Sequence, residues 1–197
     1  MKKIETIWHH ILYSALQTKR FKWTQQELAR QFGYSLSTIN HALGVPSNIG
    51  AIRKTARFFV LQDFEKLLYY WASVRNLQND IRYKTFYPGS IIKAEGEIPA
   101  GSIYAGYSAA RRLLKEAPAD YDKIYCYFAD INYFKERFPQ NSEYAPNIFV
   151  LKMPETMPQY GPITTLPHTF VDIWSLSDWY AHDFTKALEE KIHELLY

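Results

Sequence analysis

Four hydrogen-bonding residues stand close together in residues 36–43, a stretch that otherwise has the apolar spacing of a short helix. Ile39 and Leu43 mark the inner side of that helix, so the four polar residues face outward. The amide of Asn40 can pair bidentately with N6 and N7 of adenine, and hydroxyl side chains can reach bases or phosphates. The stretch therefore predicts a helix that reads base edges in the major groove of DNA. The four outward residues are Ser37, Thr38, Asn40 and His41.

Three basic residues follow in a segment with the pattern of a hairpin. Residues 51–53 and 58–61 are strand-like, and a basic turn joins them. The expected reading helix carries no Arg or Lys on its outer side, so base contacts alone predict modest affinity. The hairpin side chains Arg53, Lys54 and Arg57 are therefore expected to supply much of the phosphate binding.

Local capping signals predict the helices that position these side chains. Thr24 is expected to cap a helix, and Glu27, three residues later, completes a capping box. Gly33 ends that helix, since a left-handed conformation costs glycine little. Ser35 caps the next helix, which starts near Leu36. Two helices joined by a glycine turn form a helix-turn-helix.

Flanking elements extend this unit on both sides. An amphipathic helix is expected over residues 4–16, followed by a basic turn at residues 19–22. Gly44, Val45 and Pro46 are expected to break the reading helix. Asp63 caps a long helix over residues 64–77, which we interpret as a connector to a second domain.

The second half of the chain alternates strand-like and helical segments, which predicts a small α/β or α+β unit. The strand-like segments are residues 102–104, 123–128 and 147–152, and the helical ones are residues 108–115, 132–137, 168–176 and 178–196.

Residues 1–77 resemble winged-helix regulators of bacteria and archaea, through segments 26–29, 33–35, 37–39 and 50–61. Three later segments resemble the C-terminal half of AbiEi-type (type IV) antitoxins, in which a winged helix precedes an α/β domain. The resemblance implies a repressor of its own operon that counters a nucleotidyltransferase-type toxin. These later segments are residues 102–110 with Ser108-Ala-Ala, residues 124–128, and residues 169–174 with Val171-Asp-Ile.

Charge is distributed unevenly along the chain, whose overall formal charge is +3. Residues 1–63 carry nine Lys or Arg against three Asp or Glu, whereas residues 101–197 carry nine against thirteen. A basic first part favours a polyanion as its partner.

The longest apolar runs are too short for a membrane span, and no secretory signal is recognisable. With Cys126 as the only cysteine, these features predict a cytoplasmic protein.

An enzymatic alternative rests on Asp120 and Asp122, which follow Gly106-Tyr107-Ser108. Two carboxylates on one face of a strand can hold Mg²⁺ for nucleotidyl transfer. Lys123 stands where that motif needs an apolar residue, and the preceding residues 117–119 indicate a loop. A solvated turn is the favoured interpretation, and no enzyme activity is predicted.

Other residues with chemical potential receive structural interpretations. The six histidines form no metal-ligand pattern, so no metal or cofactor is expected. Cys126 is interpreted as a small core residue, and Asp172 as a cap or a partner of Arg111 or Arg112. The aromatic run at residues 69–71 is a candidate interface, with domain packing an equal alternative.

The predicted fold class is α+β: a winged helix-turn-helix domain (residues 1–63), a connector helix (64–78) and a mixed α/β domain with C-terminal helices (79–197). The predicted function is that of a sequence-specific DNA-binding regulator, most simply a repressor and antitoxin. Nucleotidyl transfer and a protein interaction module without DNA binding are the alternatives. The expected partners are double-stranded DNA, a cognate toxin and a second copy of the chain, and no membrane.

Overall fold

The computed structural model describes residues 1–196, which form ten α-helices, two short 3-10 helices and two small sheets. This is the mixed α+β class predicted from the sequence. The described residues divide into two compact units, Asn76–Lys191 and a first unit of Met1–Arg75 together with residues 192–196. The division after Arg75 places the expected connector helix in the first unit, whereas the sequence-based boundaries stand at residues 63 and 78.

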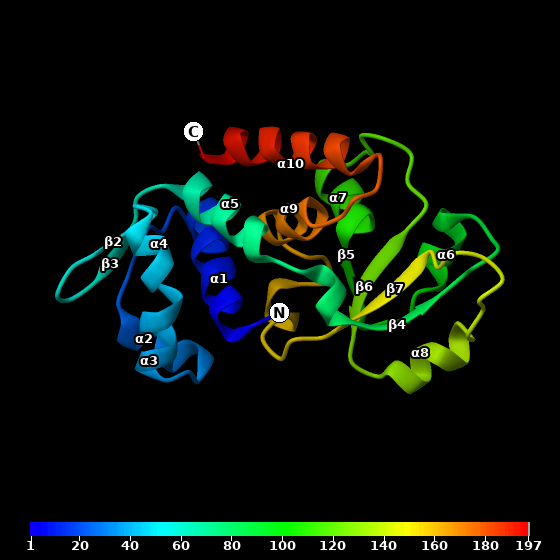
Figure 1. The fold of residues 1–197 in the computed structure, drawn as a ribbon, viewed down its shortest axis with the longest axis horizontal. Coiled ribbons are helices and arrows are strands. Elements are labelled where there is room, and N and C mark those ends of the chain that lie inside the picture. Colours follow the sequence, from blue (N-terminus) through cyan, green and yellow to red (C-terminus); the bar gives the residue numbers. More distant parts are fainter. Residues whose placement is uncertain (197) are drawn as a thin grey trace. The chain divides into compact units, whose positions relative to one another are not determined.

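The first unit consists of helices and one small antiparallel sheet of strand order β1-β3-β2 (Figure 1). Its helices are α1 (Lys3–Thr18), α2 (Gln25–Phe32), α3 (Leu36–Ala42), α4 (Gly44–Asn48) and α5 (Phe64–Val74), and its strands are β1 (Lys22–Trp23), β2 (Ile52–Lys54) and β3 (Phe59–Leu61).

Helix α1 forms the centre of this unit, and its apolar side chains Ile7, Trp8, Ile11, Leu12, Ala15 and Leu16 are buried. It packs on α3 and α5, and the Trp8 indole donates a hydrogen bond to the Ala42 carbonyl at 2.6 Å. Tyr70 meets Trp8 edge-on, with ring centroids 5.1 Å apart. Burial of two large aromatic and several aliphatic side chains stabilises such a contact by several kcal/mol, on the order of 1.5 to 3 for each.

The predicted local signals of the helix pair are confirmed. Thr24 and Glu27 form the complete capping box of α2, and Gly33 ends that helix with φ +63°. The Ser35 hydroxyl accepts from the Thr38 amide at 3.1 Å and caps α3. Asp63 caps α5 in the same way through Lys66. Each of these caps satisfies amides that the first helical turn leaves without partners.

Three expectations for the first unit are wrong in detail. Residues 22–23 of the expected turn form β1, which pairs with β3 and stacks Trp23 on Phe59 at 5.8 Å. Helix α3 ends as predicted, but residues 44–48 continue as α4, since proline in a first helical turn costs no hydrogen bond. Helix α5 ends at Val74 rather than Leu77, which begins a 3-10 helix.

The second unit contains a four-stranded mixed sheet of order β4-β7-β6-β5, in which only β6 and β7 are parallel. Its helices are α6 (Ile91–Glu97), α7 (Gly106–Leu114), α8 (Ile131–Arg137), α9 (Leu166–Trp174) and most of α10 (Ala181–Leu196), with the 3-10 helices η1 (Leu77–Asp80) and η2 (Pro158–Tyr160); its strands are β4 (Ile81–Thr85), β5 (Ile103–Ala105), β6 (Ile124–Phe128) and β7 (Ile148–Lys152).

Strand β6 is buried along its whole length because helices cover both faces of the sheet (Figure 1). Cys126 faces the core shared with α6 and α8, where Phe134 is fully buried. Tyr125 and Tyr127 face the opposite side, toward Tyr107 of α7 and His168 of α9. The strands and helices predicted for this unit are present within a few residues, but β4 and α6 were not predicted.

Candidate nucleic-acid interface

The outward side of α3 carries the residues that the sequence singled out. Ile39 and Ala42 are fully buried, and they fix the rotation of the helix. Ser37, Asn40 and His41 are consequently exposed to solvent. Their amide, hydroxyl and imidazole groups are therefore open to an approaching ligand.

Thr38 is the exception among the four predicted side chains. It is half-buried, and its hydroxyl lies 2.9 Å from the Ser35 hydroxyl. The two residues close the cap of α3, in which the Thr38 amide also donates to Ser35. Thr38 thus has a local structural role that its position in the sequence did not disclose.

The β2–β3 hairpin projects from the first unit and is closed by a tight turn (Figure 1). The Thr55 hydroxyl donates to the Phe58 carbonyl at 2.8 Å and accepts from the Phe58 amide at 3.1 Å. Arg57 lies inside this turn, while Arg53 lies on β2, and both are exposed. Neither guanidinium group has a hydrogen-bond or ion-pair partner within residues 1–196, so both remain available to an external anion.

The hairpin and α3 meet at one polar contact. The Lys54 ammonium at the end of β2 donates to the amide oxygen of Asn40 at 3.1 Å. Sequence reasoning selected both residues but assigned them to separate tasks, because nothing in the linear spacing shows that they touch. The structure therefore places Asn40, the expected reader of adenine, in contact with Lys54, an expected phosphate binder.

A groove of about 410 Å³ lies between the hairpin turn and the beginnings of α2 and α3. The first turn of α2 contributes Gln25 and Gln26 to its wall, and Arg57 lines the other side. A helix start presents amide groups and a partial positive charge, which favour an anion. The two glutamines were missed as groove residues; the available signal was the capping box of Thr24 and Glu27, between which they lie. The groove is lined by Thr24, Gln25, Gln26, Leu36, Thr55, Ala56, Arg57 and Phe58.

The acidic groups of the first 63 residues are all engaged internally. Glu5 is buried and accepts from Arg75 at 3.2 Å. Glu27 pairs with Arg20, and this contact lowers the pKa of the Glu27 carboxyl. Asp63 caps α5 and pairs with Lys66. The surface around α3 and the hairpin is therefore left with uncompensated positive charge.

The carboxylates of the enzymatic alternative do not share a strand face. Asp120 and Asp122 lie in the loop before β6, where both are exposed. The Tyr180 hydroxyl donates to the Asp122 carboxylate at 2.5 Å. Across residues 1–196, no group of three or more His, Cys, Asp or Glu is placed to hold a metal ion.

Two further sequence interpretations have clear outcomes. Cys126 is completely buried in the core, as expected. The expected pairing of Asp172 with Arg111 or Arg112 is wrong: Asp172 accepts from Tyr127 at 3.1 Å and lies 3.4 Å from His168. Both arginines bind Glu95 instead.

The aromatic run at residues 69–71 contributes to packing within the first unit. Trp71 is fully buried, and its indole lies 3.4 Å from the Glu5 carboxylate.

Within the described part of the chain, each helix is too short or too polar to cross a lipid bilayer.

Comparison of the chain with known protein families, curated proteins and solved structures gives no match.

Proposed function

We propose that the first unit is a winged helix-turn-helix domain and that the protein regulates transcription by binding double-stranded DNA at a specific sequence. In this proposal α3 enters the major groove and the β2–β3 hairpin is the wing. The observation that supports it most is the contact of Lys54 with the exposed Asn40 of α3, on a hairpin that also carries the exposed Arg53 and Arg57. Reading base edges requires polar groups such as the Asn40 amide, and binding phosphates requires cations such as the hairpin arginines.

The division of labour follows from the chemistry of each group. Asn40 and Ser37 contact base edges, and His41 contacts either a base or the backbone. Arg53 and Arg57 contact phosphates, to which the groove at the start of α2 adds amide donors. Because phosphate contacts release counterions, affinity falls steeply as salt rises.

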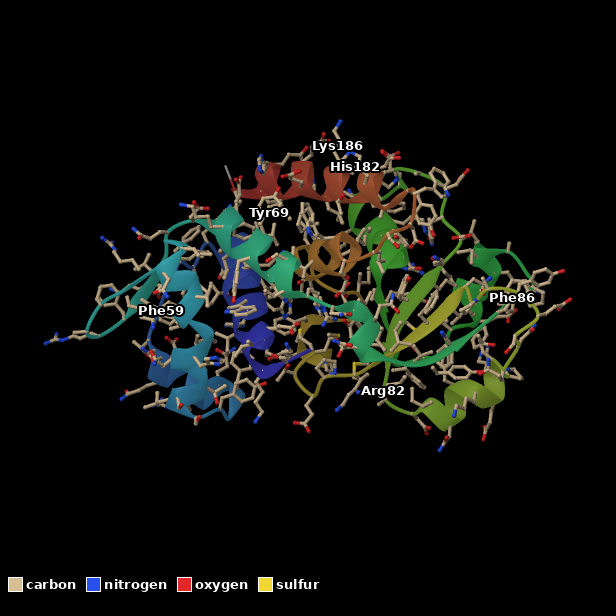
Figure 2. All side chains as sticks on the ribbon, viewed as in Figure 1. Phe59, Tyr69, Arg82, Phe86, His182 and Lys186 are labelled. Atoms are coloured by element: carbon tan, nitrogen blue, oxygen red, sulfur yellow. The ribbon has the colours of Figure 1, made fainter. Side chains whose placement is uncertain are left out.

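The test is selection from a random double-stranded DNA library with the full chain, followed by affinity measurements at several salt concentrations. Arg57→Ala should weaken binding to all sequences and reduce the salt slope by about 1. Asn40→Ala should instead relax the preference at one base pair, with a loss of roughly tenfold for the selected site. Arg82→Ala is the matched control, since Arg82 is an exposed arginine on β4 of the second unit (Figure 2). Failure of the wild type to select any sequence would overturn the proposal.

We propose the antitoxin role as the form of this regulation, following the resemblance to AbiEi-type proteins. The second unit then serves for toxin binding, dimerisation or sensing. Light scattering of the purified chain, alone and with a co-expressed nucleotidyltransferase-type toxin, measures both associations. A chain that stays monomeric and leaves the toxin free contradicts this role without affecting DNA binding.

A further inference from the structure

The direction of the hydrogen bond between Lys54 and Asn40 limits which base the proposed interface can read. The Lys54 ammonium can only donate, so the group of Asn40 that lies 3.1 Å from it is the amide oxygen. The amide NH₂ group of Asn40 is then the part turned away from Lys54. Both side chains are exposed, so the pair presents its remaining hydrogens to solvent.

The pleat of β2 explains why Lys54, and not its neighbour, reaches α3. Side chains alternate along a strand, so Lys54 shares a face with Ile52, which is buried against the body of the unit. Arg53 points to the opposite face. Pairing of Lys54 with Phe59 on β3 fixes its backbone, because Phe59 is itself buried against Trp23.

This arrangement conflicts with the reading of adenine that Asn40 alone predicts. A bidentate Asn–adenine pair needs the amide oxygen to accept from the adenine N6 amino group while the amide NH₂ donates to N7. The Asn40 oxygen has a second lone pair, but an adenine N6 amino group that used it would lie beside the Lys54 ammonium, 3.1 Å from the same oxygen, and two donors would then face each other. The edge of guanine has two acceptors, O6 and N7, and matches two adjacent donors.

We infer that Asn40 and Lys54 act as one two-donor unit that selects a guanine, with Lys54 donating to one acceptor and the Asn40 NH₂ group to the other. The inference rests on the proposed DNA binding and deepens it. Lys54 is thereby a specificity-determining residue, and the phosphate contacts of the hairpin are left to Arg53 and Arg57.

The experiment compares the sequences selected by the full-length wild type and by Lys54→Met, which keeps the aliphatic stem but has no donor. The wild type should select a guanine that Asn40→Ala no longer selects. Lys54→Met should change the preference at that position from guanine to adenine, because the competing ammonium donor beside the Asn40 oxygen is then gone. Replacing that guanine by 7-deazaguanine should weaken wild-type binding roughly tenfold, since one acceptor is lost.

Arg53→Met is the matched control, as it removes a cation from the adjacent residue on the other face of the strand. It should weaken binding to all sequences without changing the selected base. Two results would overturn the inference while leaving DNA binding intact: selection of adenine by the wild type, or a Lys54→Met variant that behaves like Arg53→Met. A wild type that selects no sequence overturns the inference together with the proposed function. Circular dichroism of each variant confirms that these exposed substitutions leave the fold unchanged.

Discussion

The buried cluster around Glu95 in the second unit and the exposed hairpin of the first unit use charged side chains in opposite ways. In the second unit, Glu95 is almost completely buried and binds Arg111 and Arg112, while Asp178 binds Lys123. In the first unit, Arg53 and Arg57 stand on the surface of a hairpin with no protein partner within residues 1–196. Charges that a protein satisfies internally serve its fold, whereas unpaired charges beside polar side chains are available for a ligand.

The cluster around Glu95 supplies a buried carboxylate with several hydrogen-bond donors. The Tyr121 hydroxyl donates to the Glu95 carboxylate at 2.6 Å, and Arg112 donates at 3.2 Å. Burial alone would raise the pKa of Glu95, but the surrounding polar groups of Ser108, Tyr121 and Arg111 lower it below its usual value. The carboxylate therefore stays charged and is committed to the fold.

The largest effect is expected from removing this carboxylate. Glu95→Ala deprives two arginines and a tyrosine of their shared acceptor, so the free energy of unfolding should fall by about 3 kcal/mol. Urea unfolding followed by circular dichroism measures the loss. Glu116→Ala removes an exposed carboxylate of the same unit and should change stability by less than about 0.5 kcal/mol. Equal effects of the two substitutions would mean that the buried carboxylate contributes no more to the fold than an exposed one.

A smaller effect concerns His10 of the first unit, whose pKa departs far from its ordinary value. Burial of the His10 ring, together with the charge of Arg20, lowers its pKa from 6.5 to about 4, against an opposing effect of Glu27. The unfolded chain then binds more protons than the folded chain between these two values. Stability should therefore fall by roughly 1 to 3 kcal/mol as the pH drops from 6.5 to 4, allowing for partial exposure of the ring.

Urea unfolding of wild type and His10→Gln at pH 7 and pH 4.5 tests this dependence. The fall in stability should be smaller in the variant by the amount that His10 contributes. His41→Gln changes an exposed histidine of the same unit and should retain the wild-type fall. A His10→Gln profile parallel to that of the wild type would contradict the expectation.

The capping box of α2 should contribute less to the free energy of unfolding than Glu95 or His10. Thr24→Ala removes the oxygen that accepts from the Glu27 amide at 3.1 Å, which typically costs about 1 kcal/mol. Thr24→Ser keeps the acceptor and should restore most of the stability. Thermal unfolding of the three proteins distinguishes the hydrogen bond from the lost methyl group, because serine lacks only the latter.

The smallest effect on stability is expected from Arg57→Ala, which removes an exposed charge and so contrasts with the removal of buried Glu95. Arg57→Ala should change the free energy of unfolding by no more than about 0.5 kcal/mol, since the guanidinium group is exposed and has no hydrogen-bond or ion-pair partner among residues 1–196. Its effect on DNA affinity should be much larger. A clear loss of stability in urea unfolding would mean that the hairpin cation serves the fold, and the comparison between the two units would fail.

Sequence reasoning succeeded where the signal was local. Thr24, Gly33, Ser35 and Asp63 were identified because each acts within a few residues of itself. Strand β1 was missed because its partner β3 lies far along the chain, and two residues have no pattern of their own. Strand β4 also pairs with a distant strand, β7, although the alternation of its five residues was a period-two signal present in the sequence.

The candidate site was predictable residue by residue but not as an arrangement. Helical spacing placed Asn40 on the outer side of α3, and composition identified the hairpin cations. The contact of Asn40 with Lys54 depends on the pleat of β2 and on its packing, neither of which is written in local spacing. Asp172 was given the wrong partners because Glu95, in the unpredicted α6, binds both arginines.

The tryptophans of the two units differ in solvent exposure, so their fluorescence can be distinguished. Trp8, Trp23 and Trp71 lie in the interior of the first unit, whereas Trp174 and Trp179 of the second unit are 49% and 79% exposed. Iodide should therefore quench emission from the second unit and spare that of the first. The remaining blue-shifted emission would report on the interior of the first unit alone, so its unfolding can be followed without any added label.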